Sequence, residues 1–181
     1  MTYQRVALIG LGLIASSMAH AMRAGKLAGE IVGHDRSAET RAVALRLFCD
    51  RVTETAAEAV KDADLVVLCV PVGAMGALAV EIGPHLKPGA VVTDVGSVKQ
   101  AVVDAVAPHM PAGAHFIPGH PLAGTEYSGP QSGFATLFQN RWWLLTPLSD
   151  TDPVEIGRLR QFLEAMGANV DEMDVARHDL V

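Results

Sequence analysis

Four segments of the chain are almost continuously apolar, and this pattern constrains the fold more than any other feature of the sequence. They are residues 5–10, 30–35, 64–70 and 90–95. Strands of a parallel sheet are buried on both faces and therefore carry such runs. Helical patterns follow them over residues 15–25, 37–48, 73–86 and 98–110. Strands that alternate with helices predict an α/β fold with a doubly wound, mostly parallel sheet.

The second half of the chain extends this prediction. Two further strands are predicted at residues 114–119 and 142–146, and a further helix at residues 153–167. A new helical pattern begins at residue 174, so we expect the sequence to end at the start of a C-terminal helical region.

The composition narrows the classes of function. The 181 residues are half hydrophobic, which is enough for one sizeable domain, and their formal net charge is −6. This charge argues against a nucleic-acid partner or an acidic membrane surface. Cys49 and Cys69 are isolated, and no His, Cys or Asp cluster has the spacing of metal ligands, so no metal site is expected. No apolar stretch reaches transmembrane length, and we expect a soluble cytoplasmic protein.

The first predicted strand runs directly into the sequence GLGLIA. Gly10, Gly12 and Ala15 match G-x-G-x-x-A, in which the glycines allow a tight turn and the close approach of a pyrophosphate. The following helix offers free N–H groups to phosphates. The motif predicts a Rossmann-like dinucleotide site, with Leu13 and Ile14 beside the cofactor.

The second predicted strand ends in Asp35, 23 positions after Gly12. A carboxylate near this spacing accepts a hydrogen bond from the ribose 2′-hydroxyl of NAD and repels the 2′-phosphate of NADP. Arg36 comes next and is the residue type that an NADP site uses, so the prediction favours NAD without excluding NADP. The alternative for Asp35 is that it only caps the next helix.

Two later strand ends add candidates to the same edge of the sheet. Val70 and Pro71 end the third apolar run, and Asp94 and Ser97 follow the fourth in the sequence TDVGSVK. Ligands of open α/β sheets bind at the carboxyl ends of the strands. Ser97 is interpreted either as an N-cap or as a hydroxyl that faces the cofactor and substrate, and both roles are compatible.

His120 follows the predicted strand 114–119, in the turn-rich sequence PGHPLAGTEYSG (118–129). An imidazole has an ordinary pKa near 6.5 and suits the removal of a hydroxyl proton while a hydride leaves carbon. Spacing alone leaves a structural role equally open. The other histidines are expected mostly on the surface or in packing; they are residues 20, 34, 85, 109, 115 and 178.

Five segments together resemble the prephenate/arogenate (cyclohexadienyl) dehydrogenase family of tyrosine biosynthesis. They are GLGLIASS (10–17), VPVGAM (70–75), TDVGSVK (93–99), GHPLAGTEYSGP (119–130) and ARHD (176–179). The resemblance implies that His120 interacts with the ring hydroxyl of the substrate and that Ser97 lies beside it. It places Thr125 and Glu126 near the substrate.

The reaction implied is an NAD-dependent oxidative decarboxylation of prephenate, arogenate or both. The resemblance also implies an NAD-binding domain over residues 1–167, and residues 168–181 as the start of a helical substrate and dimerisation domain. The chain is therefore expected to be the cofactor half of an enzyme that is a homodimer at full length. Lys99 and Arg141 are candidates, by charge alone, for holding the substrate carboxylates.

Two alternatives remain at this point. One is another Rossmann dehydrogenase, such as a β-hydroxyacid dehydrogenase or an imino-acid reductase, against which the sequence GHPLAGTE argues. The other is a non-catalytic NAD-binding module. Turnover with prephenate and arogenate, compared with 3-hydroxy acids, separates these classes.

Overall fold

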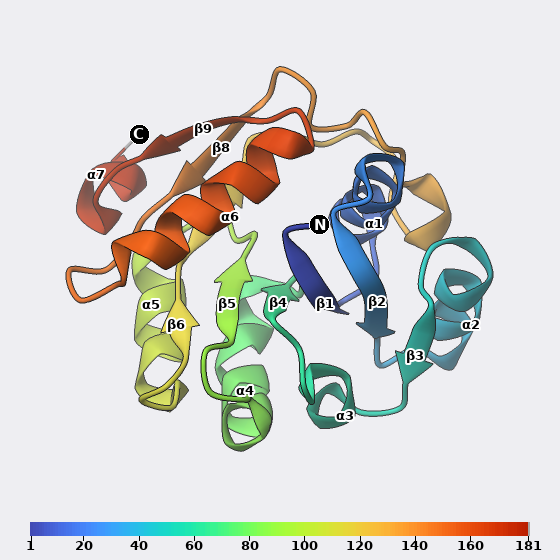
Figure 1. The fold of residues 1–181 in the computed structure, drawn as a ribbon, viewed down its shortest axis with the longest axis horizontal. Coiled ribbons are helices and arrows are strands. Elements are labelled where there is room, and N and C mark those ends of the chain that lie inside the picture. The colour runs from blue at the N-terminus through green and yellow to red at the C-terminus, as the bar shows by residue number, and fades with distance from the viewer. Residues whose placement is uncertain (181) are drawn as a thin grey trace.

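The larger of two sheets is fully parallel. The structure, a computed structural model, describes residues 1–180. This sheet has the strand order β3-β2-β1-β4-β5-β6 (Figure 1). Its strands are β1 (Tyr3–Ile9), β2 (Ala28–His34), β3 (Arg51–Thr53), β4 (Leu65–Leu68), β5 (Val91–Asp94) and β6 (His115–Phe116). The predicted α/β class and the four apolar strands are confirmed, whereas the short β3 was not predicted.

Helices connect the strands where the sequence predicts them, except that α3 was not predicted. They are α1 (Leu13–Gly25), α2 (Ala38–Leu47), α3 (Ala56–Val60), α4 (Val72–Ile82) and α5 (Gln100–Val106). The last two are shorter than predicted and continue as 3₁₀ turns, η1 (Gly83–His85) and η2 (Ala107–His109), each containing a proline. A proline has no N–H, and its ring clashes with the preceding helical turn, so an α-helix ends there.

The two faces of the sheet bury separate apolar layers. Along β1, Val6 and Leu8 pack in a cluster with α1, whereas Ala7 and Ile9 pack in a second cluster with α3, α4 and α5. Successive side chains of a strand point to opposite faces, so a strand covered on both sides is apolar throughout. This double coverage explains why the strand pattern was readable in the sequence.

A second, smaller sheet packs against the α1 side. It consists of β7 (Gly119–Pro121), β8 (Trp142–Leu145) and β9 (Asn169–Glu172), with β7 antiparallel and β9 parallel to β8. Trp143, Leu145 and Val170 of this sheet join the α1 cluster, together with residues of α6 (Pro153–Ala165). Figure 1 shows α6, β8 and β9 together, with α7 (Val175–Leu180) beside β9 and the 3₁₀ turn η3 (Pro130–Ser132) near α1.

This second sheet corrects the predicted strand at residues 114–119. The segment is divided between β6 and β7 because Pro118 has no N–H to continue the ladder with β5. The ladder ends where Ile117 N donates to Val92 O, and the next available donor, Gly119 N, turns to the side chain of Asp94. The predicted strand 142–146 exists as β8 but belongs to the smaller sheet. Strand β9 was not predicted.

Helix length excludes a membrane-spanning role for the described helices. Helices α1 and α6 have 13 residues each. A helix needs about 20 apolar residues to cross a bilayer. Accordingly, no helix within residues 1–180 is long and apolar enough to do so.

Candidate functional site

A cavity of about 570 Å³ opens at the carboxyl ends of β1 and β4. The chain leaves β1 toward β2 and β3 on one side and returns to β4 on the other, so the strand order reverses between these two strands. Open α/β sheets bind ligands at this reversal, and the volume lies in the usual range for ligand sites. Its lining includes most of the predicted cofactor residues, namely Gly10, Gly12, Asp35, Arg36, Val70 and Pro71.

The two glycines of the first loop have different structural roles. Gly10 has φ +91°, and a Cβ built on it would lie 2.7 Å from the carbonyl oxygen of Cys69. Gly12 has an ordinary φ of −98°, and a Cβ there would meet nothing within 4 Å. The backbone therefore requires glycine at position 10, whereas Gly12 leaves space open beside the cavity.

The N-terminus of α1 is open toward this space. Gly12 is its N-cap and supplies no side-chain hydrogen bond, and the first turn carries no acidic residue. The unpaired N–H groups and the helix dipole make such an end favourable for an anion. Leu13 and Ile14, predicted beside the cofactor, are half-buried against the core and do not line the cavity.

The Asp35 carboxylate forms hydrogen bonds to the backbone around the cavity. Its Oδ2 accepts a hydrogen bond from Leu11 N at 3.0 Å, and its Oδ1 accepts one from Ser37 N at 2.9 Å. The predicted N-cap role belongs to Ser37, whose hydroxyl accepts from Thr40 N at 3.2 Å. A carboxylate has about four acceptor positions, so Asp35 keeps capacity for a ligand hydroxyl. Arg36 lines the same cavity.

Ser97 lies outside this cavity and is exposed on the β5–α5 connection. The N-cap interpretation is wrong, because α5 begins at Gln100 and its cap position is Lys99. The N–H groups of Lys99 and Gln100 donate instead to the carboxylate of Asp179, at 2.8 and 2.9 Å. A side chain 80 residues away along the chain thus caps this helix.

His120 lies within β7, opposite Leu144 of β8, and not past the end of a strand of the large sheet as predicted. Its Nδ1 is 2.9 Å from Nε2 of His178, and Nδ1 of His178 is 2.8 Å from Oδ1 of Asp179. Burial, with smaller contributions from His178 and Lys99, lowers the pKa of His120 to about 4. The imidazole is therefore neutral at physiological pH and has an unprotonated nitrogen.

Two histidines expected on the surface or in packing lie at the candidate sites instead. His178 is buried against His120, and His34 lines the cavity while its Nδ1 contacts Thr53 O at 2.9 Å. Neither has a local sequence signal of a functional histidine. For His178 the only indication in the sequence is the motif ARHD, which also contains Asp179.

A buried ion pair joins the two sheets. The Lys99 ammonium lies 2.5 Å from Oδ2 of Asp94 and 2.5 Å from the carbonyl oxygen of Gly119, while Oδ1 of Asp94 accepts from Gly119 N at 3.1 Å. Both side chains are fully buried. Burial lowers the pKa of Lys99 and raises that of Asp94, and their mutual attraction opposes both changes.

This pair corrects the expectation for Lys99, because a fully buried, paired ammonium is not free to hold a substrate carboxylate. Arg141 is exposed. Thr125 and Glu126 are also exposed, in the loop after β7, where the Thr125 hydroxyl accepts from Tyr127 N at 3.1 Å. Within residues 1–180, no three His, Cys, Asp or Glu side chains are grouped so as to hold a metal ion.

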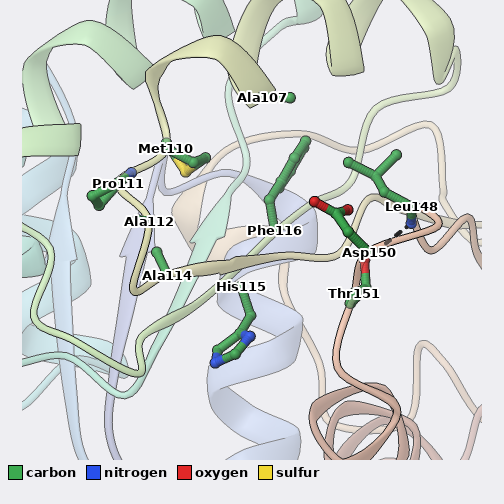
Figure 2. A pocket seen from close by; sticks show the side chains of 10 residues that line it. All are labelled: Ala107, Met110, Pro111, Ala112, Ala114, His115, Phe116, Leu148, Asp150 and Thr151. Atoms are coloured by element: carbon green, nitrogen blue, oxygen red, sulfur yellow. Dashed lines mark hydrogen bonds between the residues drawn. The ribbon is translucent and has the colours of Figure 1, made fainter.

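A second cavity of about 230 Å³ lies beside β6 (Figure 2). It is formed by residues of the segment 107–116 and of the loop 148–151, where Leu148 N donates to the hydroxyl of Thr151 at 3.1 Å. Figure 2 shows the imidazole of His115 pointing away from the carboxylate of Asp150. No pair of reactive groups converges in this cavity, and we assign it no role.

The parallel sheet, the glycine loop and the cavity at the strand-order reversal define a nucleotide-binding domain of the Rossmann-like class. Residues 18–172 match the family described as prephenate dehydrogenase, nucleotide-binding domain, and the chain belongs to this family.

Individual relatives agree with this assignment. The chain is 42% identical to the cyclohexadienyl dehydrogenase of Zymomonas mobilis over 99% of its own length and 61% of the relative's. It is similar to the crystal structure of Aquifex aeolicus prephenate dehydrogenase in complex with hydroxyphenyl propionate and NAD⁺ (TM-score 0.89, 30% identity, 97% of this chain and 62% of that one). It is equally similar to Synechocystis arogenate dehydrogenase (TM-score 0.89, 32% identity, 97% and 62%). The chain thus spans less than two thirds of the length of these proteins.

The ion pair yields a stability prediction. Lys99→Met should lower the free energy of unfolding by about 3–5 kcal/mol, because it leaves the Asp94 carboxylate buried without a partner. The matched control is Lys87→Met, since Lys87 pairs with Asp64 but is 36% exposed, and such a pair contributes about 0–1 kcal/mol. Urea unfolding measures both. Equal losses in the two variants would show that the buried pair does not hold the sheets together.

The glycine loop yields a second prediction. Gly10→Ala should destabilise the protein by about 1–3 kcal/mol, because alanine is strained at its positive φ and meets the Cys69 carbonyl. Gly12→Ala should change stability by no more than about 0.5 kcal/mol, yet weaken nucleotide binding by filling the open space. Urea unfolding and calorimetric titration separate the two effects. The assignment of roles fails if Gly12→Ala is the more destabilising variant.

Proposed function

We propose that this chain binds NAD and supplies the proton acceptor for the oxidative decarboxylation of prephenate, arogenate or both. The observation that carries the proposal is a neutral, hydrogen-bonded imidazole, His120, in a domain of the prephenate dehydrogenase family. The family assignment argues against the alternative of a β-hydroxyacid dehydrogenase. Because the relatives are longer than this chain, the activity itself is part of the proposal.

The lining residues fit a dinucleotide. The open N-terminus of α1 and the space over Gly12 suit a pyrophosphate, and the free acceptor capacity of Asp35 suits a ribose hydroxyl. Val70 and Pro71 would border the bound nucleotide where β4 ends. When bound, NAD supplies the acceptor for the hydride that leaves the substrate ring.

His120 would act on the ring C4 hydroxyl. Its unprotonated ring nitrogen accepts the hydroxyl proton, so that the C4 oxygen becomes a carbonyl as the hydride departs. The ring carboxylate then leaves as CO₂, and the electron pair of the broken bond moves through the ring to the C4 oxygen. This gives an aromatic phenolate that takes up a proton, which makes the overall change favourable. The protein contributes position and a base, and an oriented base of this kind accelerates a reaction by about 10²–10⁴-fold.

Other predicted residues take supporting roles in the proposal. Ser97 lies on the loop between Asp94 and Lys99, and both of these residues bond to Gly119 at the start of β7. The Ser97 hydroxyl is therefore held on a segment next to His120. Thr125 and Glu126 would border the substrate from the exposed loop after β7. We also propose that residues 1–167 form the NAD-binding domain, that residues 168–181 lead into a helical domain, and that the complete enzyme is a homodimer.

Cofactor choice is testable on this chain. It should bind NAD more tightly than NADP, because Asp35 repels a 2′-phosphate. Asp35→Asn should narrow the difference, since it removes the charge but keeps an acceptor for Leu11 N. Isothermal titration of both nucleotides measures the effect, and unfolding in urea controls for loss of structure. Tighter or equal binding of NADP by the unaltered chain would refute the NAD assignment.

The base is testable by kinetics. His120→Asn should lower kcat by about 10²–10⁴-fold and leave NAD affinity unchanged. The control is His115→Asn on β6, which lies in the second cavity. NADH formation from prephenate and from arogenate should be measured on this chain and on a chimera that joins it to the remaining part of the Zymomonas relative. A kcat within a few-fold of the original would remove His120 from the mechanism.

A further inference from the structure

Three side chains from distant parts of the sequence form a continuous polar chain. The Asp179 carboxylate contacts Nδ1 of His178, and Nε2 of His178 contacts Nδ1 of His120. The two imidazoles meet edge to face, with ring centroids 5.1 Å apart and planes at 69°. The contacts fall on specific nitrogen atoms, so they constrain where the protons lie.

The protonation state follows from donor and acceptor rules. An ionised carboxylate only accepts hydrogen bonds, so Nδ1 of His178 carries a proton. We take the imidazole of His178 as neutral, so that its other nitrogen is an acceptor and Nε2 of His178 accepts from Nδ1 of His120. His120 in turn is left with an unprotonated Nε2. Within residues 1–180, this Nε2 has no hydrogen-bond partner.

We propose that His178 and Asp179 are positioning residues that hold His120 in the Nδ1–H form, with Nε2 oriented as the proton acceptor. This inference rests on the proposed function, because it assigns the acceptor atom of that reaction. The hydroxyl proton of the substrate forms a new bond to Nε2, and the Nδ1 proton stays in the hydrogen bond to His178. The resulting positive charge lies one imidazole away from the carboxylate of Asp179.

The orienting group is itself firmly held. Asp179 accepts from the N–H groups of Lys99 and Gln100 at the start of α5, and together with the bond to His178 these lower its pKa to about 2. It is therefore ionised over the whole physiological range. His178 is 5% exposed, so its ring has little freedom to turn.

The other charged groups near His120 favour the same arrangement. The Lys99 ammonium is bonded to Gly119 O, next to His120, and it opposes a positive charge on the free imidazole. The carboxylate of Asp94 already receives that ammonium and two backbone N–H groups, so it does not compete for the imidazole. Asp179, acting through His178, is thus the carboxylate that determines the tautomer.

The test is NMR spectroscopy of this chain labelled with ¹⁵N-histidine, with and without NAD. Long-range ¹H–¹⁵N correlations identify which ring nitrogen carries the proton. At pH 7, His120 should be in the Nδ1–H form, and it should titrate near pH 4. Asp179→Asn should raise the ratio of Nε2–H to Nδ1–H forms about tenfold, the scale of one net hydrogen bond.

The matched control is Asp174→Asn, which removes a carboxylate at the start of the same helix, where it accepts from Arg177 N, without touching either imidazole. It should leave the tautomer of His120 unchanged. A predominant Nε2–H form in the unaltered chain would overturn the proposal whatever the variants do. An equal response of the tautomer to Asp174→Asn and Asp179→Asn would also overturn it. If the tautomer is as expected but the chimera forms no NADH, the proposed reaction fails, while the assignment of the His120 tautomer to His178 and Asp179 stands.

Discussion

The buried contact between Lys99 and Asp94 determines how the two sheets meet. Both groups lie at the carboxyl end of β5, and both bond to the backbone of Gly119 at the start of β7. Removing two charges from water is costly, and partners and hydrogen bonds offset this cost. Here the ammonium has two acceptors, and the carboxylate accepts from the ammonium and from two backbone N–H groups. The strand that carries His120 is therefore fixed relative to the edge of the large sheet, although it belongs to the small one.

The two parts of the candidate site, the nucleotide cavity and the imidazole of His120, are held in place by different interactions. The nucleotide cavity depends on backbone geometry, namely the positive φ of Gly10, the open N-terminus of α1 and the reversal of strand order. The imidazole depends instead on a chain of polar side chains that ends at Asp179. Backbone geometry tolerates substitution of neighbouring side chains, whereas a polar chain fails when one member is lost.

This difference explains how far the sequence predicted the structure. Continuous apolar runs revealed β1, β2, β4 and β5, and the glycine spacing located the cavity, because both signals lie within a few consecutive residues. Pro118 indicated in the sequence that the predicted strand 114–119 is interrupted, but the second sheet was not predictable, since it depends on a bond from Gly119 to Asp94. The contact of His120 with His178 spans 58 positions and has no local pattern. The motif ARHD indicated that the segment 176–179 belongs to the family pattern, but it did not indicate that His178 contacts His120.

The bond from Asp179 to the start of α5 also has a consequence for the order of assembly. It joins residues 80 positions apart, whereas the walls of the nucleotide cavity come from the first 81 residues. Contacts between distant residues form late, and a chain under synthesis folds its N-terminal part first. On this order of assembly, the segments that line the cofactor cavity are all present in a nascent chain before the segment that contacts the imidazole of His120. Under the proposed mechanism, His120 would become an oriented proton acceptor only once α7 has docked.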